Sequence, residues 1–309
     1  MDGPWVGYQL PVRKVSWLKR DTLLFNISIG CKADELQFLY ERHPQFSTFP
    51  TFPFGLVFKL DNQEVTDFYA AQGAVKIPGV PELDPVRLVD GDRTIEMLKL
   101  LPVTSEGRQF EFRSKIVGVF DKGKAGTVVR TEHLLVDAAS DEIYTRNVGS
   151  EFYVGQGNWG GPRGPPAQRH PPPEGKTVDL SFQVHIDAQS SHLYRLNGDY
   201  NPLHATPEPG KQMGYGGLIN HGVFAYNVIA HEFVRRLGKS DPLSLQQLSA
   251  RFSGPVKPGD DIAIEVWNIG RNSEGWDQIR WFAKVVGSDR PCLSDGTALV
   301  KPQYETGKL

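Results

Sequence analysis

A stretch rich in proline and glycine near the middle of the chain constrains the fold most. The sequence from Gly157 to Lys176, GNWGGPRGPPAQRHPPPEGK, contains six prolines and few apolar residues. Proline lacks a backbone N–H and breaks helices and central strands, so this stretch is predicted to be extended and polyproline-like. It divides the chain into a first half, residues 1–158, a linker, residues 159–176, and a second half, residues 177–309.

Composition narrows the class of protein. The chain has 309 residues, of which 39% are hydrophobic and 23% charged, as in an ordinary globular protein with room for two domains. A net charge of −2 gives no basic excess for nucleic acid, and no apolar run is long enough to span a membrane. Cys31 and Cys292 lie at opposite ends of the chain, without zinc spacing or a disulfide framework. We therefore expect a soluble protein of a reducing compartment, without nucleic-acid or membrane partners.

The apolar pattern of the second half predicts one helix and several strands. VDLSFQVHID, LQQLSARFSGPV, DDIAIEVWNIG, DQIRWFAKVVG and CLSDGTALVKP are typical of strands separated by turn residues. The segment HGVFAYNVIAHEFVRRLG is typical of a helix, and its apolar residues cover too much of the circumference for a surface helix. We expect this helix to lie in the concave face of an antiparallel sheet. The first half carries a similar run of strands, which predicts an α+β fold in which each half wraps a sheet around one long helix.

The stretch YRLNGDYNPLH, residues 194–204, gathers Asp199, Asn201 and His204 within six residues. A polar turn explains the asparagine, glycine and aspartate but gives the histidine no role. A calcium loop is excluded because Pro202 stands where that loop needs glycine. A metal site would use Asp199 and His204, but the sequence offers no third ligand nearby. A carboxylate and an imidazole that transfer protons on a rigid loop remain the best interpretation.

The predicted helix begins beside a glycine that bears on this interpretation. With Asn220 as the N-cap residue, Gly222 falls in the first turn, where backbone N–H groups lack intrahelical partners. Such an N–H can receive a carbonyl oxygen that gains negative charge. The alternative is that Gly222 merely allows close packing at the helix start. Together with Asp199 and His204, a Gly222 N–H donor would suit the addition or removal of water across a double bond conjugated to a carbonyl.

The motif YRLNGDYNPLH resembles the signature of the MaoC-like, (R)-specific 2-enoyl-CoA hydratases, also called hydratase 2. LINHGVFAYNVI and RFSGPVKPGD in the second half, and VDGDRTIEMLKLLP and FYVGQGNWGG in the first, are similar to the same family. The resemblance covers nearly the whole chain. It implies a double hot-dog fold, with two long helices each wrapped by an antiparallel sheet and the two sheets joined edge to edge. It also implies a degenerate first half that binds acyl-CoA without taking part in the chemistry, and a catalytic second half.

The family's functional residues carry over onto matching positions of this sequence. The resemblance implies that Asp199 and His204 are the catalytic pair, that Asn201 orients the site and that Gly222 donates to the oxyanion. Asp90 stands where relatives commonly have histidine, which is a departure. The substrate and CoA contacts that the resemblance implies are Asp90, Gly91, Lys122, Tyr200, Pro202, Leu203, Arg251 and Phe252. Neither a metal nor another cofactor is expected, because the CoA thioester is itself the substrate.

The expected reaction is the reversible hydration of trans-2-enoyl-CoA to (R)-3-hydroxyacyl-CoA in peroxisomal β-oxidation. The alternatives are a dehydratase of a specialised acyl-CoA, a non-catalytic acyl-CoA-binding hot dog and, less favoured, a thioesterase. The apolar stretch from Phe46 to Phe58 is expected to line the acyl tunnel. The terminal Gly307–Leu309 is a near neighbour of the peroxisomal Ser-Lys-Leu address. The expected partners are an acyl-CoA, the peroxisomal import receptor and, in a homodimer, a second copy of the chain.

Overall fold

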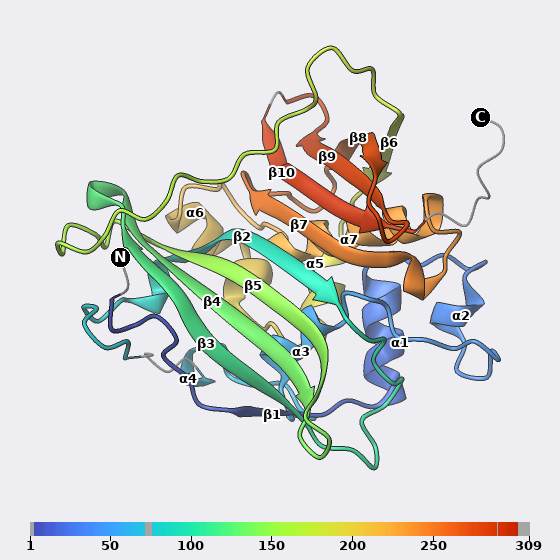
Figure 1. The fold of residues 1–309 in the computed structure, drawn as a ribbon, viewed down its shortest axis with the longest axis horizontal. Helices are drawn as coiled ribbons and strands as arrows, with labels where there is room; N and C mark the ends of the chain where they lie inside the picture. Colours follow the sequence, from blue (N-terminus) through green and yellow to red (C-terminus); the bar gives the residue numbers. More distant parts are fainter. Residues whose placement is uncertain (1–2, 72–75, 289, 302–309) are drawn as a thin grey trace.

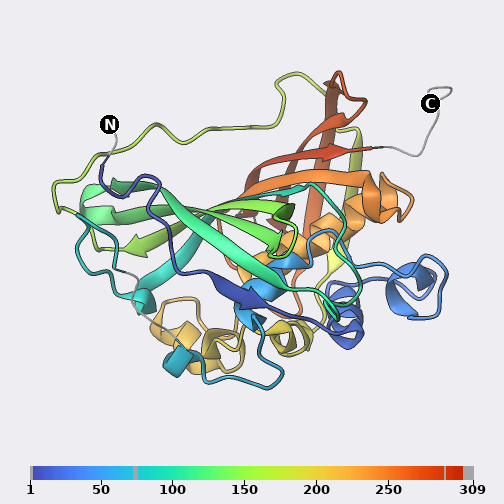
Figure 2. The ribbon, with the colours of Figure 1, turned by 60° about the horizontal axis from the view of Figure 1, so that its bottom comes forward.

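The computed structural model describes residues 3–71, 76–288 and 290–301, and in this part of the chain ten strands form one antiparallel sheet. The order across the sheet is β1-β3-β4-β5-β2-β7-β10-β9-β8-β6. The first five strands in this order come from the first half and the last five from the second (Figure 1). Figure 2 shows the helices on one side of this sheet.

The elements have the following bounds. The strands are β1 Arg13–Val15, β2 Leu88–Met97, β3 Phe110–Asp121, β4 Gly126–Asp137, β5 Glu142–Val154, β6 Leu180–His185, β7 Leu245–Phe252, β8 Asp261–Arg271, β9 Asp277–Val285 and β10 Pro291–Val300. The α-helices are α1 Lys19–Ser28, α2 Leu36–Leu39, α3 Pro53–Lys59, α4 Phe68–Ala71, α5 Ser190–Tyr194, α6 Pro207–Gln212 and α7 Gly222–Arg236. The 3₁₀ turns are η1 Pro85–Arg87, η2 Gly123–Ala125, η3 Arg195–Asn197, η4 Pro202–His204 and η5 Pro242–Ser244. No helix in the described residues is long and apolar enough to cross a bilayer.

The double hot dog with its sheets joined edge to edge is confirmed. Strands β2 and β7 pair antiparallel from Asp92 opposite Arg251 to Glu96 opposite Gln247, and this pairing joins the two halves. One detail of the prediction is wrong, because among the described residues only the second half has a long central helix. In the first half the corresponding element is α3, which has 7 residues. Pro53 starts it and Leu60 ends it with a positive φ of 53°, so the helix stops after two turns.

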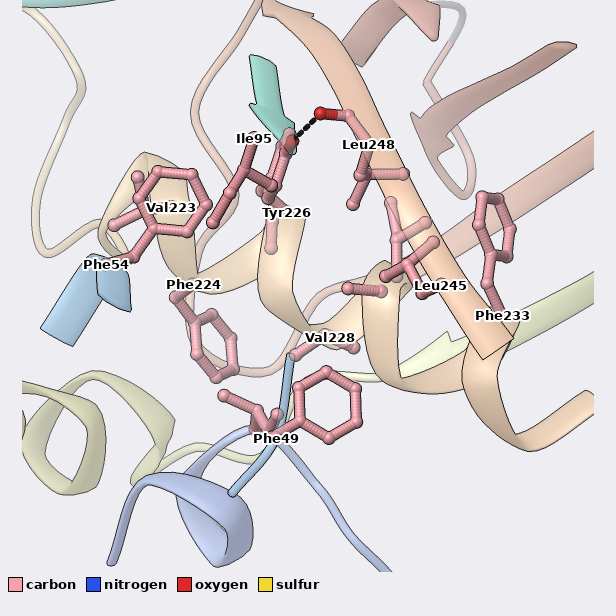
Figure 3. Packing of buried hydrophobic residues seen from close by; sticks show 14 of the residues in the cluster. Phe49, Phe54, Ile95, Val223, Phe224, Tyr226, Val228, Phe233, Leu245 and Leu248 are labelled. Atoms are coloured by element: carbon pink, nitrogen blue, oxygen red, sulfur yellow. Dashed lines mark hydrogen bonds between the residues drawn. The ribbon is translucent and has the colours of Figure 1, made fainter. Parts of the chain in front are cut away.

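The helix α7 is the centre of the core. Every residue from Val223 to Val234 is buried, as the apolar pattern predicted. Figure 3 shows the α7 side chains packed against the inner face of β7 and against Phe49 and Phe54 of the first half. The hydroxyl of Tyr226 donates a hydrogen bond to the carbonyl of Leu248 on β7. Because one continuous core contains residues of both halves, neither half buries its apolar surface alone.

The stretch between β5 and β6 runs along the outside of the sheet, on the side away from the helices (Figures 1 and 2). Two carboxylates of the sheet help to fix its path. The carboxylate of Asp121 accepts hydrogen bonds from the backbone N–H groups of Asn158 and Gly160, and Asp295 accepts one from His170 N and one from Arg169 Nη1. This stretch contains neither helix nor strand, in keeping with its proline content.

Candidate active site

The loop that carries the predicted catalytic residues is a sequence of short helical turns, α5, η3 and η4. Asn201 is the N-cap residue of η4, and its Oδ1 accepts a hydrogen bond from Leu203 N at 3.0 Å. Pro202 occupies the first position of this turn, where its missing N–H has no consequence. The turn ends at His204, so the cap and the proline together fix the direction in which the imidazole leaves the backbone. Asn201 thus orients the site through the backbone.

The first half holds this loop in place. Asn197 Nδ2 donates hydrogen bonds to Ser28 Oγ on α1, at 2.9 Å, and to Tyr194 O, at 2.8 Å. Gly198 has a φ of +118°, and a Cβ on it would lie 2.6 Å from the backbone nitrogen of Lys59. Glycine is therefore required here both by the backbone conformation and by the close approach of α3. Neither contact with the first half could be predicted from the sequence, since Ser28 and Lys59 are far from this loop along the chain.

His204 is buried, with 8% of its surface exposed, and the surrounding structure fixes its tautomer. Its Nδ1 lies 3.0 Å from the carbonyl oxygen of Ile219. A carbonyl oxygen can only accept a hydrogen bond, so Nδ1 carries the proton. Nε2 is then the unprotonated nitrogen. Burial, and next the adjacent His221, lower the pKa of His204 to about 4, while Asp199 opposes the shift. At neutral pH the imidazole is therefore uncharged and able to accept a proton.

The Asp199 carboxylate lies beside this imidazole. Its Oδ1 accepts a hydrogen bond from Asn201 N at 3.2 Å. Burial raises the pKa of Asp199, and the neighbouring His204 opposes part of this shift. A carboxyl group whose pKa is raised by burial can carry a proton that an exposed aspartate would have released. The two members of the predicted pair are thus brought together and have complementary protonation tendencies.

The start of α7 differs from the prediction. The N-cap residue is His221, so the assignment of Asn220 as the cap is wrong. Asn220 instead accepts a hydrogen bond from Ser190 Oγ at 2.8 Å, and this contact turns its side chain away from the helix start. His221 stacks on His204 with ring centroids 3.8 Å apart, and its Nε2 donates to the carbonyl oxygen of Asp199 at 3.1 Å. Burial lowers the pKa of His221 to about 3.

His221 is therefore a site residue to which sequence reasoning gave no firm role; its only signal was its position next to Gly222. It also overturns the expectation that no third ligand lies near Asp199 and His204, because ligand atoms of the three residues lie within 4.8 Å of one another. The nitrogens His204 Nδ1 and His221 Nε2 already donate to carbonyl oxygens. His221 Nδ1 is buried without a hydrogen-bond partner in the described residues.

Gly222 is the first residue of α7, so its N–H has no intrahelical acceptor. A Cβ at this position would lie 3.1 Å from Phe252 Cδ1 and 3.6 Å from Asp90 Oδ2. Gly222, Phe252 and Asp90 therefore surround one small space at the positive end of the helix dipole. The predicted oxyanion donor, the predicted acyl-site aromatic and the predicted first-half contact meet at one place, although they are far apart in the sequence.

Asp90 belongs to a charged pair that reaches the site from the first half. The Arg93 guanidinium donates to Asp90 Oδ1 from Nη2 at 2.6 Å and from Nε at 3.1 Å. A β-bulge at Gly91 places Asp90 and Arg93 on the same face of β2 although three positions separate them. A side chain at Gly91 would press on the carbonyl oxygen of Ser150, 3.1 Å from its Cβ. Gly91 thus shapes the strand next to Asp90.

The other predicted contacts with substrate or CoA lie partly beside the catalytic loop and partly away from it. Tyr200 is partly exposed beside the catalytic loop, with the Arg195 guanidinium 5.2 Å from its ring centroid, and Leu203 is also partly exposed. Arg251 is exposed and lies on the face of β7 opposite to Phe252, so the structure does not bring it to the catalytic pair. Lys122, in the β3–β4 turn, donates to the carbonyl of Arg163.

One cavity borders the catalytic loop, and a larger one lies away from it. A cavity of about 210 Å³ lies against Gly198 and Tyr200, with Phe58 and Lys59 on its other wall. A cavity of about 560 Å³ lies at the far end of α7, beside Leu243, Leu245, Lys99 and Trp276. The smaller cavity adjoins the catalytic loop and both halves, and it is the better candidate for a substrate entrance. Phe52 and Phe54 of the predicted acyl tunnel instead pack in the core.

An uncharged imidazole, a neighbouring carboxyl group whose pKa is raised by burial, and the start of α7 beside them form a site suited to acid–base chemistry. Comparison with known proteins identifies the family. Residues 16–155 match the MFE-2 hydratase 2 N-terminal domain and residues 169–289 match the MaoC like domain. The chain is 32% identical to a probable enoyl-CoA hydratase 2 of Dictyostelium discoideum, over 96% of this chain and 95% of that protein.

This chain belongs to the MaoC-like hydratase 2 family. It is 48% identical to a probable dehydratase, NIT22, of Ajellomyces capsulatus, over 94% of this chain and 80% of that protein. Its fold matches the crystal structure of a MaoC-like dehydratase from Phytophthora capsici with a TM-score of 0.83 and 25% identity, over 96% of this chain and 97% of that one. The hydratase 2 resemblance of the sequence is thereby confirmed, and the protein is an enzyme, a hydro-lyase.

Proposed function

We propose that this hydro-lyase adds water reversibly across the double bond of a trans-2-enoyl-CoA to give the (R)-3-hydroxyacyl-CoA. The observation that carries the proposal is the position of Asp199, His204 and the Gly222 N–H at the start of one buried helix. The name of the Dictyostelium relative, a probable enoyl-CoA hydratase 2, supports the substrate class. The (R) stereochemistry rests on the resemblance of the catalytic motif.

The proposed steps assign the base to His204 and the acid to Asp199. His204 Nε2 takes a proton from water as the water oxygen bonds to C3, and the π electrons of C2=C3 move to the thioester oxygen. The Gly222 N–H stabilises the negative charge on that oxygen, a contribution of about 2.7–4 kcal/mol for a single donor. Asp199 then gives a proton to C2 and regains one from His204. Atoms and charge balance without another reactant.

His221 acts on this reaction through the two catalytic side chains. It stacks on one of them and donates to the backbone carbonyl of the other, so it fixes their relative position. Its low pKa leaves it uncharged, which avoids an additional positive charge next to His204. We propose that the reaction needs neither a metal nor a further cofactor, since every proton is moved by a side chain of the chain itself.

The dehydratase direction is a second candidate, and the name of the Ajellomyces relative favours it. One site serves both directions, since elimination is the reverse of the steps above. A non-catalytic acyl-CoA-binding protein would not need a buried acid–base pair beside a helix N-terminus. A thioesterase would have to direct water to the carbonyl carbon instead of C3, which leaves the proton donor for C2 without a role.

Incubation of the protein with crotonyl-CoA and with 2-decenoyl-CoA, followed by chiral analysis, tests the proposal. We expect loss of the enoyl-thioester absorbance and formation of the (R)-3-hydroxyacyl-CoA. Formation of free CoA would identify a thioesterase instead. Binding of both thioesters without turnover would identify a non-catalytic acyl-CoA-binding protein. An (S) product would show that the face of water addition is assigned incorrectly.

A peroxisomal location stays a proposal. Gly307–Leu309, on which it was based, lies outside the described residues. We expect an N-terminally tagged protein to enter peroxisomes and a variant without these three residues to remain in the cytosol. A full-length tagged protein that stays in the cytosol would contradict the address and remove the import receptor from the expected partners.

A further inference from the structure

The larger cavity lies where the two halves meet, at the end opposite to the catalytic residues. Its volume is about 560 Å³. Cavities of about 300–1,000 Å³ are typical of sites for small ligands. Leu245 on its wall and Phe252 at the catalytic end are the first and last residues of β7, so roughly 23 Å of strand separates them. None of the residues that line the cavity belongs to the catalytic loop, so it is separate from the catalytic site.

A change of strand pairing opens this cavity. Strands β2 and β7 pair as far as Glu96 opposite Gln247, and there the pairing between the halves stops. Beyond that point the backbone N–H groups of Leu98 and Lys99 both donate to the carbonyl oxygen of Tyr144, which keeps this part of the first half beside β5. The chain of the first half thus moves away from β7, and the cavity lies between them.

The second half contributes a bulged residue with an unpaired polar atom. Leu299 of β10 lies opposite Gln247, whereas the next residue, Val300, lies opposite Leu245. Gln246 is therefore an extra residue of β7 without a partner in β10. Its side chain lines the cavity, and its Oε1 is buried without a hydrogen-bond partner in the described residues. A buried polar atom without a partner costs free energy, which a ligand that bonds to the amide would recover.

The cavity has an apolar wall on each side. Leu98 of the first half is 56% exposed and Leu243 of the second half is 61% exposed, and both line it. A single exposed leucine is common on protein surfaces, but two on opposite walls of one cavity provide apolar surface to an alkyl chain. Each CH₂ group that such a chain buries contributes about 0.8 kcal/mol. The walls therefore suit an aliphatic ligand.

The charged groups of the cavity leave one cation available. Lys99 forms an ion pair with Glu142, with Nζ 2.6 Å from Oε2. The Asp241 carboxylate accepts a backbone N–H at the start of η5. Lys301 Nζ lies 5.8 Å from the centroid of the Trp276 ring and forms no ion pair within the described part of the chain. An aromatic ring attracts an ammonium but leaves its N–H groups able to bind an anion.

We propose that this cavity binds a free medium-chain fatty acid, with its carboxylate at Lys301 and its alkyl chain between Leu98 and Leu243. The carboxylate accepts charge-assisted hydrogen bonds from the Lys301 ammonium. The Gln246 amide can donate to the same carboxylate, because rotation of the amide by 180° exchanges its oxygen for an N–H group. A small inorganic anion would leave both leucines uncovered, and an uncharged lipid would leave the ammonium unpaired. The bound acid would contact both halves at the point where their pairing stops.

The test compares octanoate with octanamide, which has the same chain and an uncharged head group. In isothermal titration calorimetry with the full-length protein, we expect one octanoate to bind per chain, about tenfold or more tightly than octanamide, the contribution of one charge-assisted contact. Lys301→Met should weaken the binding of octanoate about tenfold and leave that of octanamide unchanged. Lys301→Arg should retain the preference for octanoate. Circular dichroism checks that each variant is folded.

A second variant tests the apolar wall. Leu243→Asn should weaken octanoate and octanamide alike, by about fourfold if roughly one CH₂ group loses its contact. Lys14→Met is the control for the lysine variant, because Lys14 is exposed and lies on β1, at one edge of the sheet. It should bind both ligands as the unmodified protein does.

Three results would overturn the inference. Octanoate that binds no more tightly than octanamide would remove the role of the Lys301 ammonium. Octanoate binding that neither Lys301→Met nor Leu243→Asn changes would place the ligand elsewhere, such as in the acyl site of the enzyme. Binding only by a variant without residues 302–309 would make that segment, and not a fatty acid, the occupant of the cavity. Each result is independent of the proposed function, since the calorimetry measures binding without turnover.

Discussion

The two halves share a sheet and a topology but use their concave faces differently. The second half fills its face with α7, a helix of 15 residues that is buried almost throughout and carries the catalytic glycine at its start. The first half has only the 7 residues of α3 in the corresponding place, and its strands carry Ser114, His133 and Asn147 side by side on that face. We propose that this difference divides the work between chemistry in the second half and substrate binding in the first.

The division of roles is incomplete, because contacts between the two halves also hold the catalytic loop and α7 in place. The catalytic loop contacts α1 and α3 through Asn197 and Gly198. Glu35 of the first half accepts a hydrogen bond from His231 Nε2 on α7 at 2.7 Å, which links the two halves in the core. The first half is thus part of the scaffold that holds the catalytic residues.

The largest expected effect is on the catalytic pair. Asp199→Ala and His204→Ala should each lower kcat on crotonyl-CoA by about 10²–10⁴-fold, and the double variant should lose little more, because both residues serve one transition state. His185→Ala is the control, since this histidine is exposed and pairs only with Asp261 at the surface. Near-normal turnover by either single variant in steady-state assays would show that the chemistry lies elsewhere.

The next largest effect is expected at the start of α7, in the small space between Gly222, Phe252 and Asp90. Gly222→Ala places a methyl group 3.1 Å from Phe252 Cδ1 and near the Asp90 carboxylate, so we expect kcat/KM to fall about tenfold or more as the thioester oxygen loses its place at the N–H. Adding Phe252→Leu should recover part of the loss by relieving the contact. If the double variant is no better than Gly222→Ala, the glycine is not needed for space at this position.

The contact by which the first half supports the catalytic loop can be disrupted by a substitution at Gly198. Gly198→Ala forces an alanine into a φ of +118° and against the backbone of Lys59, and we expect a loss of about 3 kcal/mol in unfolding free energy, with lower activity. Gly275→Ala is the control, with a φ of +85° and no atom within 4 Å of the new Cβ. It should cost about 1 kcal/mol and leave kcat unchanged. Equal losses in denaturant unfolding would show that contact with the first half is unimportant.

The smallest effect is a pH dependence of the contact between the halves. Glu35 is buried, and although burial alone would raise its pKa, hydrogen bonds from His231, Ser240 and Lys32 N together lower it to about 2. A lowered carboxyl pKa stabilises the fold above the unfolded value, near 4.5, and this stability is lost as the pH falls from 4.5 towards 2. Glu35→Gln should therefore lower the unfolding free energy by about 1.5 kcal/mol at neutral pH.

The same measurement at lower pH checks the cause. The difference between Glu35→Gln and the unmodified protein should shrink as the pH falls below 4.5. Glu142→Gln is the control, because Glu142 forms an exposed ion pair with Lys99, and such pairs contribute little. A Glu35 difference that stays constant down to pH 3 would mean that the hydrogen bonds do not depend on the carboxylate charge.

Local sequence patterns determined most of the secondary structure of this protein. The apolar circumference of residues 223–234 identified the central helix, the alternating segments identified the strands of the second half, and six prolines set the path between β5 and β6. The crowding of Asp199, Asn201 and His204 predicted where the chemistry takes place, because a simple turn gives the histidine no role and Pro202 excludes a calcium loop. These signals are readable because secondary structure and turn geometry depend on residues a few positions apart.

Tertiary structure alone decided which distant residues meet. The cap of α7 is His221, because the carbonyl of Asp199 and the ring of His204 hold that side chain in place; Asn220 is engaged by Ser190. The bulge at Gly91 brought Asp90 and Arg93 onto one face, and strand register placed Ser114, His133 and Asn147 side by side on three strands. Register and packing bring together residues more than a hundred positions apart, and no local pattern in the sequence records those contacts.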